Sequence, residues 1–244
     1  MAEEERLEVG EAPSLQPTNS SGIAQRRTPY VKPMLTIEKT GSSVSLSLGN
    51  FKTQYPLVLP LVVCLAYFIW MVYNGAHPLF NASDTCLYLG GGEADSIFRK
   101  HEWWRLVTSI FAHADVFHLL GNMAAYIFGV FFLREVLSPW KVVAVFFACG
   151  LAGSLFCSVT AAYVFVGASG GILGLYGAFI GYGILDADLF KRHQNALLVA
   201  FVVVLISIAG SFRVGVSLAI HAAGLLTGFF IGCGVPLWKQ RNAD

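Results

Sequence analysis

The sequence predicts an all-α membrane protein with six transmembrane helices. Hydrophobic residues make up 55% of the 244-residue chain, and charged residues make up only 13%. A soluble domain carries about 25% charged residues, and the mean hydropathy of this chain is +0.62. Charges are also nearly absent from several apolar runs of the length that spans a bilayer as a helix, about 20 residues. Six apolar spans follow from this pattern, roughly 55–73, 118–133, 140–163, 168–185, 195–211 and 214–237.

The spans divide the chain into a tail and a membrane domain. Residues 1–54 are polar, acidic at the start and rich in Ser, Thr and Pro. Such a composition buries too little apolar surface to order itself, which predicts a disordered cytosolic tail. The six-helix domain is expected over 55–238, followed by a short cytosolic segment, 239–244. A long first loop, 74–117, contains the run His101-Glu-Trp-Trp-Arg105, which is expected at the membrane interface, where Trp prefers to lie.

The distribution of Lys and Arg predicts the orientation in the membrane. Twelve of these residues lie on the side of the tail and four on the other side, and cytosolic loops carry the excess. Both termini are therefore expected in the cytosol. The tail and the glycosylation sequon at Asn81 favour a secretory-pathway or plasma membrane. A net charge of +1 argues against a nucleic-acid partner, and the five scattered cysteines indicate no disulfide framework.

Four polar side chains fall inside the predicted spans. The second span holds His118 and Asn122, the fourth opens close to Ser169, and the sixth holds His221. Counted from the cytosolic end of each helix at about 1.5 Å per residue, Ser169 and His221 lie roughly 25 Å up, His118 roughly 24 Å and Asn122 roughly 18 Å. Since the hydrocarbon core is about 30 Å thick, all four share one outer-leaflet layer. Polar groups at such positions are costly and by default indicate function.

Nucleophilic acyl transfer is the chemistry that these residue types permit. A serine hydroxyl is a weak nucleophile until a neighbouring base takes its proton, and histidine is the usual base. At the start of its helix, Ser169 would lie beside unpaired N–H groups and the positive end of the helix dipole, which favour a developing oxyanion. His118 and Asn122 are four residues apart, hence on one helix face, and both can donate hydrogen bonds to that oxyanion. No carboxylate lies within the membrane part of a span, so we expect a Ser–His dyad without an acidic third member.

Three motifs in chain order carry a resemblance to a known family. They read His113-(four residues)-His118-(three residues)-Asn122, Gly167-Ala-Ser169-Gly, and His221-Ala-Ala-Gly224-(three residues)-Gly228. Each motif alone is a weak signal. Together, at spans two, four and six of a six-span chain, they resemble the rhomboid family over the stretch from Trp104-Arg105 to Gly228.

The resemblance implies a six-helix bundle around a water-filled polar cavity that opens to the outer side, with no cofactor. By motif, Ser169 is the nucleophile and His221 is the base. The oxyanion site is implied for His118, Asn122 and Gly167. Typical substrates of the family are single-pass membrane proteins that are cut near the outer face. The residues with supporting roles are His113, Trp104, Arg105, Gly224 and Gly228, the two last as small residues that let helices approach closely.

The chain departs from the usual pattern of this family at two places. Many members carry an aromatic residue four positions after the serine, packed on the catalytic histidine, where this chain has Leu173. An acidic or amide residue often precedes that histidine by a few positions, where this chain has Ser217. The first difference bears on the orientation of the histidine but not on the presence of the dyad.

Each site residue also has a purely structural interpretation. Ser169 could be a small packing residue in a Gly-rich helix interface, and His221 could bond a neighbouring helix. His118 and Asn122 could form a structural polar network, and His113 could support the loop or bind a water in the site. His113 and His118 are disfavoured as metal ligands, because five residues of helix separate them by about 140° and no third ligand accompanies them.

The predicted function is an intramembrane serine endopeptidase that cuts single-pass membrane proteins within the bilayer, near its outer or lumenal face. Two other functions compete with it. An inactive rhomboid relative that escorts membrane proteins would have lost the serine or the histidine, and both are present. A small channel or transporter would place polar groups near the midplane, often with inverted repeats, whereas the polar groups here cluster in one leaflet.

Overall fold

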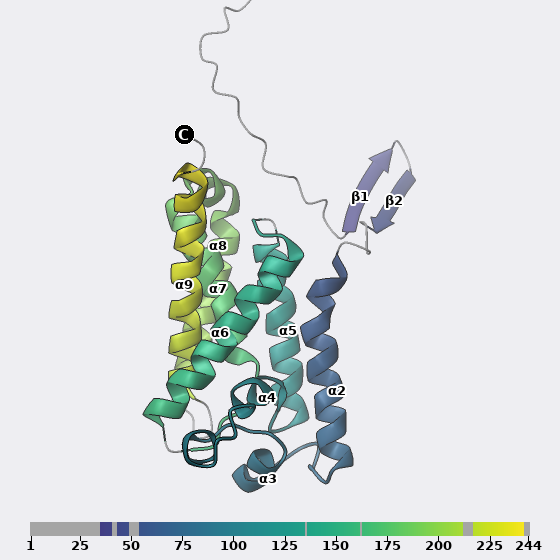
Figure 1. The fold of residues 1–244 in the computed structure, drawn as a ribbon. Coiled ribbons are helices and arrows are strands. Elements are labelled where there is room, and N and C mark those ends of the chain that lie inside the picture. Colours follow the sequence, from purple (N-terminus) through teal and green to yellow (C-terminus); the bar gives the residue numbers. More distant parts are fainter. Residues whose placement is uncertain are drawn as a thin grey trace, which may run out of the picture. The chain divides into compact units, whose positions relative to one another are not determined.

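A computed structural model describes residues 35–40, 43–48, 54–134, 136–161, 163–211 and 217–241. Figure 1 shows a short hairpin and a bundle of helices. The hairpin strands are β1 (Leu35–Thr40) and β2 (Ser43–Leu48). The helices are η1 (Tyr55–Val58), α2 (Leu59–Tyr73), α3 (Ser83–Tyr88), η2 (Asp95–Arg99), α4 (Arg105–Phe111), α5 (Val116–Leu133), α6 (Pro139–Thr160), α7 (Ser169–Leu185), α8 (Ala187–Gly210) and α9 (Leu218–Arg241).

The hairpin was not expected from the sequence, which predicts a disordered tail over residues 1–54. β1 and β2 pair antiparallel, with Leu35 opposite Leu48 and Ile37 opposite Leu46. These apolar residues alternate with polar ones, which is the period-2 pattern of a strand with one apolar face. Residues 1–34, 41–42 and 49–53 of the predicted tail lie outside the described residues.

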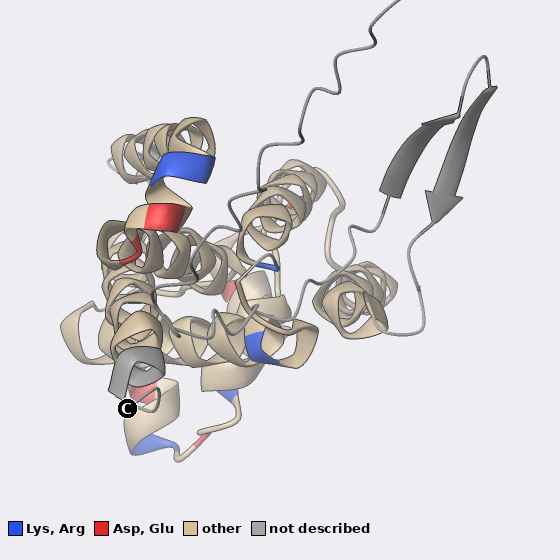
Figure 2. Ribbon diagram, turned by 90° about the horizontal axis from the view of Figure 1, so that it is seen from above, with Lys and Arg blue, Asp and Glu red and all other residues tan. Residues whose placement is uncertain are grey.

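Five helices of the described chain are long and apolar enough to cross a membrane. Their outward side chains are large and apolar: Ile69 is 60% exposed, Ile206 67% and Phe230 69%. Soluble proteins rarely expose apolar patches of more than a few hundred Å², whereas lipid solvates such a surface. Figure 2 shows that Lys, Arg, Asp and Glu are sparse on the helices. The five spans are 55–73, Val116–Leu133, Pro139–Thr160, 187–209 and 218–237.

The remaining predicted span, 168–185, forms α7, an apolar helix of 17 residues. It packs against α5, α6, α8 and α9, and most of its side chains are buried. A helix of this length extends about 25 Å, which is less than the roughly 30 Å of a hydrocarbon core. Because neighbouring helices surround α7, its first residue, Ser169, can lie within the bundle rather than at its surface.

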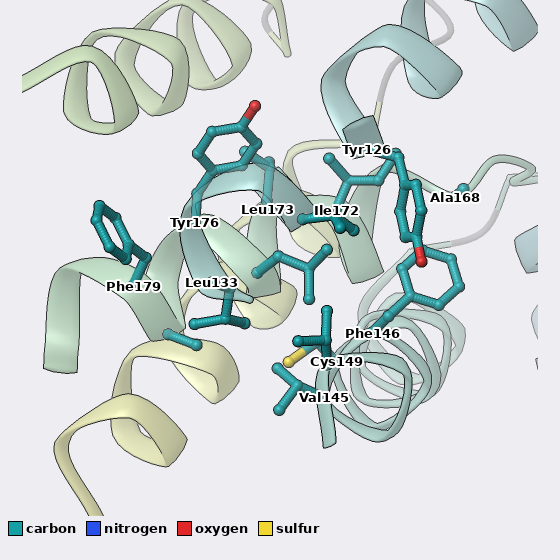
Figure 3. Packing of buried hydrophobic residues seen from close by; sticks show 14 of the residues in the cluster. Tyr126, Leu133, Val145, Phe146, Cys149, Ala168, Ile172, Leu173, Tyr176 and Phe179 are labelled. Atoms are coloured by element: carbon teal, nitrogen blue, oxygen red, sulfur yellow. The ribbon is translucent and has the colours of Figure 1, made fainter. Parts of the chain in front are cut away.

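The core of the bundle lies where α5, α6 and α7 meet, and Figure 3 shows its packing. Phe146 and Cys149 of α6 and Leu175 of α7 are fully buried. Two tyrosine hydroxyls join elements by donating to backbone carbonyls: Tyr126 to Leu57 (3.0 Å) and Tyr176 to Ala125 (2.9 Å). Buried polar groups need such partners because an unpaired one costs several kcal/mol in lipid.

The segment between α2 and α5 contains α3, η2 and α4. In Figure 1, α3 and α4 lie at the end of the helices that is opposite the C-terminus. Arg105, the first residue of α4, is 7% exposed and donates to the carbonyl oxygens of Leu87 and Gly91 and to the carboxylate of Glu102. Its guanidinium also lies 4.3 Å from the ring centroid of Trp104. These contacts are those of an anchor that holds the segment together.

We expect Arg105→Lys to lower the free energy of unfolding by about 2 kcal/mol, because an ammonium group cannot reproduce a planar guanidinium that serves two carbonyls and a carboxylate. Thermal unfolding in detergent measures the effect. The matched control is Arg99→Lys. That side chain is 84% exposed, and among the described residues its one ion pair is with Asp95 at the surface, where a change stays within about 0.5 kcal/mol. Equal Tm values for the two variants would contradict the anchor role.

Candidate active site

The side chains of Ser169 and His221 are in hydrogen-bond contact. Ser169 Oγ lies 2.8 Å from Nε2 of His221, and the histidine is only 8% exposed. Ser169 is the first residue of α7, and His221 lies in the first turn of α9. A hydroxyl beside an imidazole nitrogen at this distance has the geometry of a nucleophile and its base.

The register of α7 against α9 brings the side chains of Ser169 and His221 to the same position along the helix axes. A Cβ added to Gly224 would overlap the carbonyl of Gly170, and one added to Gly228 would overlap the carbonyl of Gly174. The contacts advance by one turn on both helices together, so the helices run parallel with their backbones touching. Parallel helices in this register place their N-terminal ends side by side, which aligns Ser169 with His221.

The N-terminus of α5 carries the second polar pair. Asp115 caps this helix, and its carboxylate accepts the backbone N–H of His118 at 2.8 Å. The cap sets where the helix begins, so His118 lies in the first turn and Asn122 one turn later on the same face. A Cβ on Gly167 would lie 2.8 Å from the His118 ring and 3.6 Å from Asn122 Nδ2. Both side chains therefore reach the backbone two residues before Ser169.

Gly167 contributes space rather than a hydrogen-bond donor. Its φ of +117° is a backbone conformation that residues other than glycine rarely adopt. Its N–H donates to the carbonyl of Ser109 at 2.8 Å, so this backbone group is already engaged. The oxyanion role implied for Gly167 is corrected in this respect: the residue lets His118 and Asn122 approach, but it offers no unpaired N–H.

Backbone N–H groups without a partner in their own helix occur at the start of α7. The first backbone hydrogen bond of this helix runs from Ile172 to Ala168, at 3.0 Å. The N–H groups of Ser169, Gly170 and Gly171 precede it and have no carbonyl of their own helix to bond. They place the positive end of the helix dipole beside the Ser169 side chain.

His113 and Asn122 line one small pocket among apolar side chains of α2, α5, α6 and α7. His113 is fully buried, and its Nδ1 must donate to the carbonyl of Phe111 at 2.9 Å, because a carbonyl can only accept. Burial lowers the pKa of His113 to about 3, so the ring is neutral. Within the described residues, His113 Nε2 and Asn122 Nδ2 have no hydrogen-bond partner. The amide of Asn122 is therefore free to donate to a ligand.

One site contact was missed from the sequence. The hydroxyl of Ser211, at the end of α8, lies 2.5 Å from Nδ1 of His221. The sequence marks Ser211 only as the end of the fifth predicted span. No spacing rule relates a residue on one helix to a ring on another, so only the tertiary structure reveals this contact.

Trp104 and Arg105, which the sequence predicts to support the site, lie in the segment between α2 and α5. Trp104 is 50% exposed and packs on Arg105, which anchors the segment before α5. Gly92 and Phe165 exchange backbone hydrogen bonds of 2.9 Å, which joins that segment to the strand-like residues before α7. Among the described residues, His, Cys, Asp and Glu form no group of three that could hold a metal ion.

Comparison with known proteins identifies the family. The Rhomboid domain model matches residues 100–237, more than half of the chain. RHOMBOID-like protein 1 of Arabidopsis thaliana is 32% identical over 158 residues, which are 64% of this chain but 41% of that protein. YdcA of Bacillus subtilis (strain 168) is 29% identical over 202 residues, 79% of this chain and 96% of its own length.

Other relatives differ in the activity that their names state. Rhomboid protease GluP of Bacillus subtilis (strain 168) is 24% identical over 214 residues, 87% of this chain and 41% of that protein. Inactive RHOMBOID-like protein 8 of Arabidopsis thaliana is 26% identical over 129 residues, 52% of this chain and 37% of that protein. The domain match and the apolar helices together lead to one conclusion. The chain is an integral membrane protein that belongs to the rhomboid family.

Proposed function

We propose that this chain is an intramembrane serine protease in which Ser169 is the nucleophile and His221 is the general base and acid. The observation that carries the proposal is the 2.8 Å contact between Ser169 Oγ and His221 Nε2. It joins two residues that are 52 positions apart in the sequence. The family match and a relative named as a rhomboid protease support the same reaction class.

The geometry supports acyl transfer in two stages. In the first, His221 Nε2 takes the hydroxyl proton of Ser169 as Oγ attacks the carbonyl carbon of the scissile peptide bond. The tetrahedral intermediate then breaks its C–N bond, and His221 returns the proton to the leaving amine. In the second, water attacks the acyl-serine ester, again with His221 as base, and releases a carboxylic acid and free Ser169.

Donors for the oxyanion come from two helices. The side chains of His118 and Asn122 on α5 lie against the backbone at Gly167. The N–H of Ser169, the first residue of α7, follows two residues later in the chain. Hydrogen bonds from such preorganised donors to a developing negative charge can contribute strongly to lowering the barrier. Within the described residues Asn122 Nδ2 has no hydrogen-bond partner, which supports its assignment as one of these donors.

We expect Asn122→Ala to lower kcat by about 10²–10³-fold with little change in stability, since one oxyanion donor contributes that factor in other hydrolases. The buried amide has no partner to lose within the described residues, so its removal leaves no other group unsatisfied. Steady-state cleavage in liposomes measures the rate, and thermal unfolding measures the stability. A variant with unchanged kcat would assign Asn122 to a structural role.

The proposed substrates are single-pass membrane proteins, cut near the outer or lumenal face. Six spans, α7 included, would place both termini in the cytosol, and the excess of Lys and Arg on that side supports this orientation. The Ser169–His221 pair would then lie in the outer leaflet, reached through the predicted outward-opening cavity. A secretory-pathway or plasma membrane is the proposed location.

Labelling by a fluorophosphonate probe tests the proposal directly. The probe forms a covalent bond only with an activated serine, so we expect the wild-type chain to be labelled and Ser169→Ala to stay unlabelled. An inactive membrane-protein escort, the alternative that the name of one relative raises, would bind substrates without being labelled. Absence of labelling together with absence of cleavage in the wild type would favour that alternative.

A further inference from the structure

We propose that Ser211 is a positioning residue that holds His221 in the tautomer required to accept the proton of Ser169. The inference rests on the proposed function of the Ser169–His221 pair. Ser211 is 5% exposed, follows the last residue of α8, and places its Oγ 2.5 Å from His221 Nδ1. The imidazole of His221 is thus held between two serine hydroxyls, one on each ring nitrogen.

The hydrogen bond between Ser211 and Ser207 determines the direction of the other hydrogen bonds around His221. Ser211 Oγ lies 2.9 Å from the carbonyl oxygen of Ser207, and a carbonyl can only accept. The single hydroxyl proton of Ser211 is therefore donated to Ser207. The contact with His221 then requires that Nδ1 carries a proton and donates it to Ser211 Oγ.

The tautomer of His221 is fixed as a consequence. A neutral imidazole has one N–H, so a proton on Nδ1 leaves a lone pair on Nε2. That lone pair accepts the hydroxyl proton of Ser169 across 2.8 Å. All three hydrogen bonds run in one direction, from Ser169 through His221 and Ser211 to the Ser207 carbonyl, and a general base needs this direction.

Ser211 thereby performs with a neutral hydroxyl the orienting role that a buried carboxylate performs in Ser-His-Asp hydrolases. Among the described residues, no carboxylate contacts His221. A serine that donates back to the carbonyl four residues earlier is common in helices and is by itself only structural. The second contact of the same oxygen, with Nδ1 of a histidine on another helix, distinguishes Ser211 from that common case.

Nitrogen NMR of His221 tests the tautomer without reference to activity. In a detergent-solubilised chain with ¹⁵N-labelled histidine, the His221 signals are assigned by their loss in His221→Ala. We expect the wild type to show a protonated Nδ1 and an unprotonated Nε2. In Ser211→Ala we expect signals of the other tautomer to appear. A protonated Nε2 in the wild type, or an unchanged tautomer in Ser211→Ala, would overturn the proposal.

Kinetics provide the second readout. We expect Ser211→Ala to lower kcat by about 10-fold, the factor that one ordinary hydrogen bond contributes, with KM unchanged because no substrate contact is lost. Ser211→Thr keeps the hydroxyl and should restore most of the rate. A rate loss that Thr does not restore, or a rise in KM alone, would show a packing role instead.

Ser217→Ala is the matched control for stability. Ser217 Oγ accepts the N–H of Ile220 at the start of α9 and contacts Cys157 and Tyr163. Loss of the Ser217 hydroxyl should lower Tm while kcat stays near the wild-type value. If the wild type itself shows no proteolysis, the proposed function fails, but the tautomer of His221 is still decided by NMR. Failure of the two proposals is therefore distinguishable.

Discussion

Ser169→Ala and His221→Ala are each expected to abolish proteolysis, lowering the rate by about 10⁴-fold or more. In the proposed mechanism the hydroxyl supplies the attacking oxygen and the imidazole takes its proton, so neither step proceeds when either group is removed. The double variant should be no slower than the single variants, because the two residues act as one unit. The helices that carry the two substitutions, α7 and α9, should stay folded, since alanine is the best helix former.

Cleavage of a single-pass substrate in liposomes measures this effect, with product mapping by mass spectrometry. The matched control is Ser158→Ala, which removes a buried hydroxyl on α6 whose one hydrogen bond within the described residues goes to the carbonyl of Ser154. The control should retain the wild-type rate within about twofold. A Ser169→Ala variant that keeps more than about a tenth of the wild-type rate would refute Ser169 as the nucleophile.

Gly228→Ala is expected to cause the largest loss of stability from a single added methyl group, about 3 kcal/mol or more. The new Cβ would overlap the carbonyl oxygen and Cα of Gly174 on α7. Backbone atoms cannot rotate away as a side chain would, so the two helices must separate. A shift of about 1 Å between reacting groups can cost about 10²-fold in rate. Separation of the helices should therefore also lower the rate of substrate cleavage by Ser169 and His221.

Gly234→Ala is the control for this prediction, because it adds the same atom to the same helix. A Cβ on Gly234 meets nothing within 4 Å, so stability should stay within about 0.5 kcal/mol or rise slightly. Thermal unfolding in detergent and cleavage in liposomes are measured on both variants. Equal stability of Gly228→Ala and Gly234→Ala would contradict the close parallel packing of α7 against α9.

Parts of this protein were predictable because they depend on local patterns. Five of the six apolar spans correspond to helices long enough to cross a membrane, since hydrophobicity and length decide insertion of each segment separately. The fourth predicted span, 168–185, forms α7, whose short length makes sense only once its four neighbouring helices are known. The pairing of β1 with β2 does not follow from composition, because the polar tail as a whole outweighs the short alternation of apolar residues in these two strands.

The sequence by itself determined the chemistry that is available here: one serine and three polar partners at similar depths in three spans, with glycines around them. The tertiary structure decided how these groups meet. The parallel register of α7 and α9 brings Ser169 to His221, the bond from Gly167 to Ser109 removes one expected donor, and Ser211 contacts Nδ1 of the histidine. Such contacts join residues far apart in the chain, and their geometry depends on how helices pack, which no local pattern encodes.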